Sequence, residues 1–128
     1  MGMKIAIPLF GDRVSPRFDV SPEIRLIVVE RGMVLRQEEL SAVNLTVPQR
    51  LEWIASKGVH KVICGGIDGF CRDQLGSRGI DVVQDVTGDA GIAFDHFMRG
   101  TLRPGFRCER RGRRTFCSRK QAVAERKA

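Results

Sequence analysis

Four cysteines are the side chains of this sequence best suited to chemistry. Their thiolates are soft ligands for iron-sulfur clusters, copper or zinc, and an intracellular chain favours such chemistry over disulfides. A zinc ribbon is disfavoured, because neither pair of neighbours forms a close Cys-x-x-Cys motif. For a single strand-end cysteine, the alternative is a small core residue. The candidate metal ligands are Cys64, Cys71, Cys108 and Cys117.

A glycine-rich loop begins at the first of these cysteines and runs over residues 64–69, with the sequence Cys-Gly-Gly-Ile-Asp-Gly. An apolar strand precedes this loop, and Asp68 is placed to cap the helix that follows. Glycines at such a point let a ligand approach backbone amides at the helix start, which suits an anion. An ordinary tight turn between strand and helix explains the same pattern, and both interpretations stay open.

Carboxylates and histidines offer weaker candidates for chemistry. Four aspartates in turn-rich segments could meet at one edge of a sheet and bind a divalent cation for hydrolysis, although aspartates are also ordinary turn formers and caps. His60 and His96 are expected to be surface or packing residues. No P-loop or nucleophile with a base is recognisable, so we do not expect an enzyme. The four aspartates are Asp12, Asp19, Asp68 and Asp85.

Hydrophobic patterning predicts the elements that would position these side chains. A short turn at residues 31–33 joins two strands into an antiparallel hairpin. Strands alternate with helices in the second half, which requires parallel pairing. The sequence therefore predicts an α/β fold with a five-stranded mixed sheet, flanking helices and the order βββαβαβα. The strands are expected over residues 3–9, 23–30, 34–40, 60–64 and 79–83, and the helices over residues 47–58, 68–77 and 89–98.

Positive charge is concentrated at the C-terminal end. Residues 99–128 hold eleven of the 22 lysines and arginines but two of the 15 acids, whereas residues 1–98 carry a net charge of −2. We therefore expect one domain over residues 3–102 and a basic Arg/Cys-rich tail over 103–128. The tail could bind nucleic acid or an acidic protein, or could be a solvated extension. No apolar run approaches the ~18 residues that span a bilayer, so a cytoplasmic location without membrane contact is expected.

Four short motifs, taken in order, resemble the dinitrogenase iron-molybdenum cofactor biosynthesis family of the NifX, NafY and NifB C-terminal type. They are Met-Lys-Ile-Ala-Ile-Pro at residues 3–8, Val-Ser-Pro-Arg-Phe-Asp at 14–19, Val-Ile-Cys-Gly-Gly-Ile at 62–67, and Leu75 with Gly79-Ile80. The resemblance covers about residues 3–102. It implies a ribonuclease H-like sheet and a protein that binds or carries metal-sulfur clusters. Many relatives have Phe-Gly where this chain has Phe18-Asp19, and the tail is not part of the shared domain.

The resemblance also implies which residues would bind a cluster. Ser15, Arg17 and Phe18 match the loop after the first strand, and Cys64, Gly65 and Gly66 match the glycine turn. The leading hypothesis is a non-catalytic carrier of an iron-molybdenum or other metal-sulfur cluster, working with cofactor-assembly proteins. Arg13 and Arg17 would neutralise an anionic cluster, and Cys64 would supply a thiolate. An interaction module that uses the basic tail is the alternative, and a metal-dependent hydrolase is less favoured.

Overall fold

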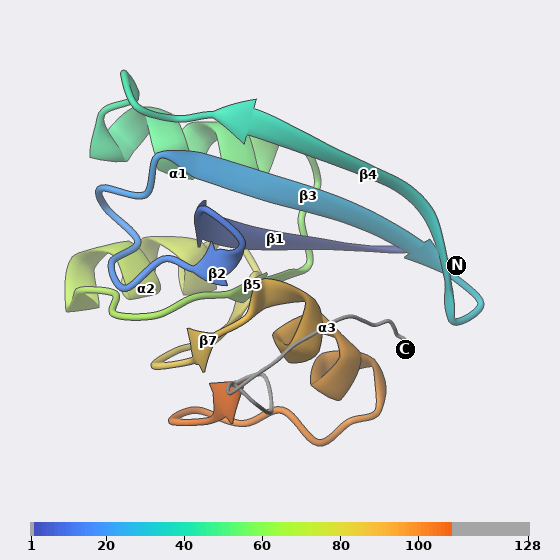
Figure 1. Ribbon diagram of the computed structural model, residues 1–128. Helices are drawn as coiled ribbons and strands as arrows, with labels where there is room; N and C mark the ends of the chain where they lie inside the picture. The colour runs from blue at the N-terminus through green and yellow to red at the C-terminus, as the bar shows by residue number, and fades with distance from the viewer. Residues whose placement is uncertain (1, 109–128) are drawn as a thin grey trace.

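A five-stranded run of paired strands forms the centre of the computed structural model, which describes residues 2–108. Two helices cover one face of this sheet and a third covers the other (Figure 1). The order across the sheet is β4 (Met33–Ser41), β3 (Glu23–Glu30), β1 (Gly2–Phe10), β5 (Lys61–Ile63) and β6 (Asp81–Val83). The short strand β2 (Arg13–Val14) pairs with the end of β1.

The predicted hairpin and the predicted parallel pairing are both confirmed. β3 pairs with β4 in antiparallel register, and β5 pairs in parallel with β1 and with β6. β3 has the sequence Glu-Ile-Arg-Leu-Ile-Val-Val-Glu. Its β-branched side chains favour a strand. Because β1 and β5 are parallel neighbours, the loops that follow them leave from the same end of the sheet.

Each helix begins at a side chain that caps it. In α1 (Val47–Ser56), Thr46 and Gln49 form a capping box, with Pro48 in the first turn. Asp68 accepts a hydrogen bond of 2.7 Å from the Cys71 amide and so starts α2 (Gly69–Ser77), as predicted. Asp89 accepts one of 3.0 Å from the Ile92 amide at the start of α3 (Ala90–Met98).

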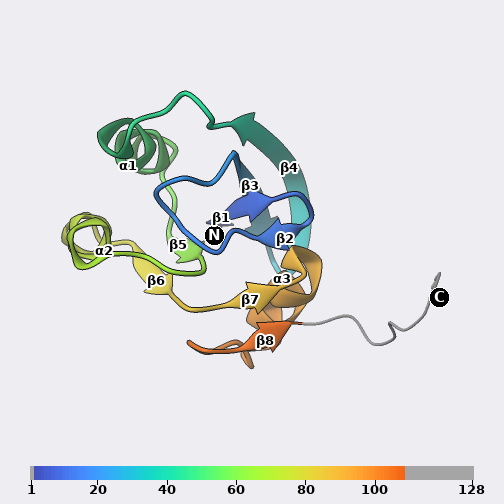
Figure 2. The same ribbon diagram turned by 60° about the vertical axis from the view of Figure 1, so that its left-hand side comes forward.

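Two hydrophobic clusters fill the spaces on either side of the sheet. Side chains alternate between the faces along β1, so Ala6 belongs to the cluster under α1 and α2, whereas Ile5, Ile7 and Leu9 belong to the cluster under α3. Figure 2 shows α1 and α2 on one side of the central strands and α3 on the other. Every central strand therefore has both faces covered, which explains its nearly continuous apolar sequence.

Three two-residue strands make the observed order longer than the predicted βββαβαβα. Besides β2, these are β7 (Thr87–Gly88) and β8 (Arg107–Cys108), which form a small parallel sheet of their own. Strands this short carry no alternating pattern from which they could be predicted. The ribonuclease H-like arrangement stays a prediction.

Residues 103–108, which were assigned to the tail, pack on the domain. Cys108 is buried in the cluster under α3, and Phe106 packs against the same cluster. The remainder of the predicted tail, including Cys117, lies outside the described residues. Among the helices of residues 2–108, none is long and apolar enough to cross a membrane.

Candidate functional site

Two of the loops singled out in the sequence are joined directly by their backbones. The loop after β1 and β2 and the loop after β5 form a parallel bridge between Arg17 and Gly66. The Gly66 amide donates to the carbonyl oxygen of Pro16 at 2.7 Å, and the Phe18 amide donates to the carbonyl oxygen of Gly66 at 2.8 Å. We call residues 14–18 together with 64–66 the loop junction. It lies at the carboxyl end of the parallel strands β1 and β5.

Close approach of the two loops explains the glycines of the junction. A Cβ at position 65 would overlap the carbonyl oxygen of Ser15, and one at position 66 would lie 3.0 Å from the carbonyl oxygen of Pro16. The Gly66 amide is already hydrogen-bonded to the facing loop, so it does not point at a ligand. In this structure Gly65 and Gly66 allow the two loops to pack closely, a role that neither interpretation of the sequence included.

Buried side chains hold the first loop of the junction in place. Phe18 is 1% exposed and packs in the cluster under α1 and α2, so the structure gives it a core position. Ser15 is also buried, and its hydroxyl donates to the carbonyl oxygen of Arg17 at 2.9 Å. The predicted contacts of Ser15 and Phe18 with a cluster stay predictions.

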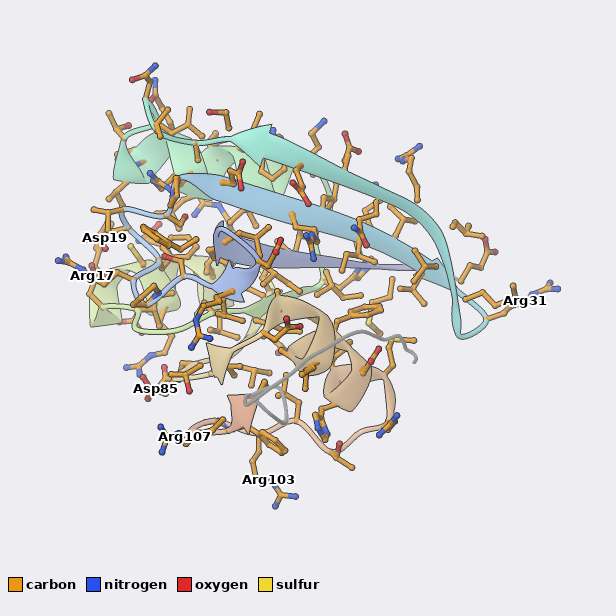
Figure 3. The ribbon with its side chains drawn as sticks, in the orientation of Figure 1. Arg17, Asp19, Arg31, Asp85, Arg103 and Arg107 are labelled. Carbon is orange, nitrogen blue, oxygen red and sulfur yellow. The ribbon has the colours of Figure 1, made fainter. Side chains whose placement is uncertain are left out.

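Two arginines place positive charge at the carboxyl end of β1 and β5. The guanidinium of Arg17 is exposed and forms an ion pair with Asp19 (Figure 3). Arg13 is exposed on β2, and its backbone forms a bridge with Asp89 at the start of α3. The junction therefore combines a hydrogen-bonded pair of loops with the exposed guanidinium of Arg17, which can reach an anion.

Cys64, the first residue of the 64–66 loop, and Cys71 share one hydrophobic cluster, but Cys108 does not join them. The first two belong to the cluster under α1 and α2, whereas Cys108 belongs to the cluster on the opposite face of the sheet. All three are fully or almost fully buried. Among residues 2–108 no group of three or more His, Cys, Asp or Glu side chains is arranged to hold a metal ion. A four-cysteine site that includes Cys117 stays a prediction.

Burial also changes the acidity of these thiols. Loss of solvation, reinforced by the charge of Asp85, raises the pKa of the Cys64 thiol from 9.0 to about 12. The pKa of Cys71 is raised to about 12 as well, by burial and by its hydrogen bond to Asp68. Both side chains are therefore neutral thiols at neutral pH, and a metal ligand would first have to lose its proton.

The raised thiol pKa values predict alkaline destabilisation. Because each folded-state pKa lies above the unfolded value of 9.0, the stability that each neutral thiol contributes is complete below pH 9 and is lost between pH 9 and about 12. The free energy of unfolding should fall by up to about 1.4 kcal/mol per pH unit for each thiol. Urea unfolding at pH 8 to 11 measures this, without interference from tyrosine, which the chain lacks. A Cys64→Ala/Cys71→Ala variant with the same pH slope would contradict the prediction.

The four candidate aspartates are used individually for structure. Asp19 pairs with Arg17, Asp68 caps α2, and the amide of Asp85, a residue with φ of 60°, donates to the carbonyl oxygen of Gly65. The carbonyl oxygen of Asp12 accepts from Ala90 at the start of α3. Among residues 2–108, no three of these carboxylates are grouped so that they could hold a metal ion, and the hydrolase alternative stays a hypothesis.

Arg50 is a structural residue of the site that the sequence did not indicate. It lies on α1 and is 2% exposed. Its Nη1 donates to the carbonyl and hydroxyl oxygens of Ser21 at 2.7 and 2.9 Å, and its Nη2 donates to the carbonyl oxygen of Ala42 at 2.8 Å. Burial lowers its pKa, an effect that the charge of Asp19 opposes. Arg50 thus fastens the segment after the junction to α1. One feature of the sequence could have indicated its burial. Arg50 lies four residues before the core residue Ile54, and residues with this spacing share one face of a helix.

These features define a mixed α/β domain with its candidate site at the carboxyl end of neighbouring parallel strands. Solved structures with this fold include a candidate dinitrogenase, MJ0327, from Methanocaldococcus jannaschii, with 18% identity and a TM-score of 0.67 over 80% of this chain and 93% of that one. The apo form of the orange protein from Desulfovibrio gigas has 22% identity and a TM-score of 0.64, covering 78% and 90% of the two chains.

A third similar structure is a candidate NifB protein from Thermotoga, TM1290. It has 24% identity and a TM-score of 0.65, over 80% of this chain and 92% of that one. No protein-family model and no curated protein sequence matches the chain. The likeness to these three structures establishes a shared fold.

Proposed function

We propose that this protein is a non-catalytic binding or carrier protein for an iron-molybdenum or other metal-sulfur cluster, and that it assists cofactor assembly or delivery. The observation that carries the proposal is the loop junction, because it brings together the two segments to which the resemblance assigns cluster-binding residues. The proposal is supported by the fold shared with a candidate dinitrogenase, a candidate NifB protein and the orange protein, whose structure is that of an apo form.

The chemistry of the junction suits an anionic cargo held at the surface. Arg17 and Arg13 are exposed at the end of the sheet where the loops after β1 and β5 meet. An arginine guanidinium presents several donors in a fixed plane and binds anions through paired hydrogen bonds. A cluster with net negative charge would therefore be neutralised by arginine side chains, while the packed loops keep their positions fixed.

Direct ligation by cysteine would be a second step in this proposal. The Cys64 side chain is fully buried, and its raised pKa keeps it protonated. A bond from Cys64 to the cargo metal would require an opening of the packed cluster around the thiol and the loss of its proton. Docking through arginines can precede that opening, and a cofactor-assembly protein that donates or receives the cluster would supply the partner.

Anaerobic reconstitution tests the proposal. We expect purified protein incubated with iron, sulfide and molybdate to retain metal and sulfide and to show visible absorption bands after desalting. Arg17→Gln should lower the retained metal about threefold, because a charge pair at an exposed arginine contributes up to about 1 kcal/mol. The Arg25→Gln variant, which alters an arginine on β3, is the matched control.

Two cysteine variants separate the possible ligands. If Cys64 ligates metal, Cys64→Ser loses the absorption bands and Cys108→Ser/Cys117→Ser keeps them, whereas a tail site gives the opposite result. Wild-type protein that retains neither metal nor sulfide would refute the carrier function.

A further inference from the structure

The exposed arginine of the loop junction already holds an anion that belongs to the chain itself. Arg17 Nε donates to Asp19 Oδ1 at 3.1 Å, and Arg17 Nη2 donates to Asp19 Oδ2 at 2.7 Å. This two-point contact is the geometry with which a guanidinium recognises an external carboxylate or tetrahedral oxyanion. The Arg17 side chain is 67% exposed and that of Asp19 is 25% exposed, so solvent anions can reach the arginine.

We propose that Asp19 is an internal competitor that occupies the Arg17 guanidinium and sets which anions can bind at the loop junction. A monoanion gains little binding free energy by displacing the carboxylate of Asp19, which is tethered only two residues from Arg17. A multiply charged anion interacts more strongly with the guanidinium and can displace this carboxylate. Asp19 thus selects for polyanionic cargo and against chloride or carboxylates. This inference rests on the proposed function for the class of ligand.

A second cation lies within electrostatic reach of the displaced carboxylate. Asp19 interacts with the charge of Arg50, which is buried beneath the same loop. The Nη groups of Arg50 are bonded to Ser21 and Ala42, but its Nε is a buried donor with no hydrogen-bond partner in the described part of the chain. When a ligand takes Arg17, the charge of Asp19 is still balanced by Arg50, which lowers the cost of releasing the exposed arginine.

The neighbouring acid does not replace Asp19 in this role. Asp68 also interacts with the charge of Arg17, but its carboxylate accepts the Cys71 amide at 2.7 Å and caps α2. Asp19 is therefore the carboxylate that fills the hydrogen-bonding sites of Arg17, and a change at Asp19 should affect anion binding without removing a helix cap.

Molybdate, a tetrahedral dianion, is the probe for the test. Calorimetric titration at low ionic strength should show molybdate binding about three- to tenfold tighter in Asp19→Asn than in wild type, because an exposed ion pair contributes up to about 1 kcal/mol and a like charge is removed as well. Arg17→Gln should abolish the gain in the Asp19→Asn background. The NMR signal of the Arg17 Nε–H should exchange faster with solvent in Asp19→Asn than in wild type.

Glu39→Gln provides the matched control, because Arg25 donates to Glu39 Oε2 through Nε and Nη2 at 2.9 and 2.8 Å, away from the junction. That variant should bind molybdate as wild type does. Equal affinities in wild type and Asp19→Asn, or no binding by either, overturn the inference. Tighter binding in Asp19→Asn without retained cluster in reconstitution leaves the inference standing and refutes the carrier function. Retained cluster with equal molybdate affinities refutes the inference alone.

Discussion

Alanine at position 65 should lower the free energy of unfolding by about 3 kcal/mol, because its Cβ would overlap backbone of the facing loop. The overlapped atom is the carbonyl oxygen of Ser15, and Pro16 offers two further backbone atoms at 3.0 and 3.1 Å. A backbone atom cannot rotate away as a flexible side chain can, so the two loops must separate. Chemical denaturation of Gly65→Ala measures the loss.

Gly69→Ala is the matched control for this variant. Gly69 lies in the first turn of α2, four residues further along, and a Cβ there meets nothing within 4 Å. Alanine favours a helix by up to about 1 kcal/mol relative to glycine, so this variant should be as stable as wild type or slightly more stable. Equal losses in the two variants would show that the glycines are needed for chain flexibility and not for close approach. Gly65→Ala should also impair cluster retention, since the junction positions Arg17.

Replacement of Arg50 by methionine should produce the other large loss of stability, again about 3 kcal/mol. Methionine fills much of the same volume but removes all three hydrogen bonds of Arg50. The fully buried carbonyl oxygen of Ser21 loses its donor, whereas that of Ala42 keeps the hydrogen bond from the Leu45 amide at 3.1 Å. An unsatisfied buried acceptor costs about 1–3 kcal/mol. Removal of the buried charge, which is itself costly to desolvate, offsets part of this loss. Thermal and urea unfolding measure the change.

Arg72→Met tests whether the loss is specific to the buried arginine. Arg72 is exposed on α2 and makes one side-chain hydrogen bond, to Gln84 at 3.2 Å. Its replacement should change stability by less than about 0.5 kcal/mol. A similar small effect for Arg50→Met would mean that water replaces the guanidinium as a donor to Ser21 and Ala42.

The parts of the fold that the sequence predicted are those with a strong local pattern. The β-branched run of β3 and the turn after it predicted the hairpin, and Asp68 predicted the start of α2. The strands β2, β7 and β8 were missed because two residues cannot show alternation, and they form only where another backbone lies alongside. Gly88 shows the same dependence, because a Cβ there would overlap the backbone of Cys108.

The sequence singled out the two loops of the candidate site, but it did not indicate which of their side chains are exposed. The loops containing Arg17 and Gly66 were matched separately, and the structure joins them by a backbone bridge. Exposure was harder to foresee, because it depends on packing between distant segments. Phe18 is a core side chain, Cys64 is covered completely, and Arg50 is buried although most arginines are exposed.

The position of β1 between β3 and β5 has a consequence for how the protein folds. The β3–β4 hairpin closes through a short turn, whereas β1 must find β5 across the whole intervening chain, with Ala6 beside Val62. Local contacts form quickly and distant ones slowly, so the hairpin can be in place before the parallel pair forms. β1 also contributes side chains to the clusters on both faces of the sheet. The two clusters should therefore become fully packed in the same step, when β1 pairs with β5.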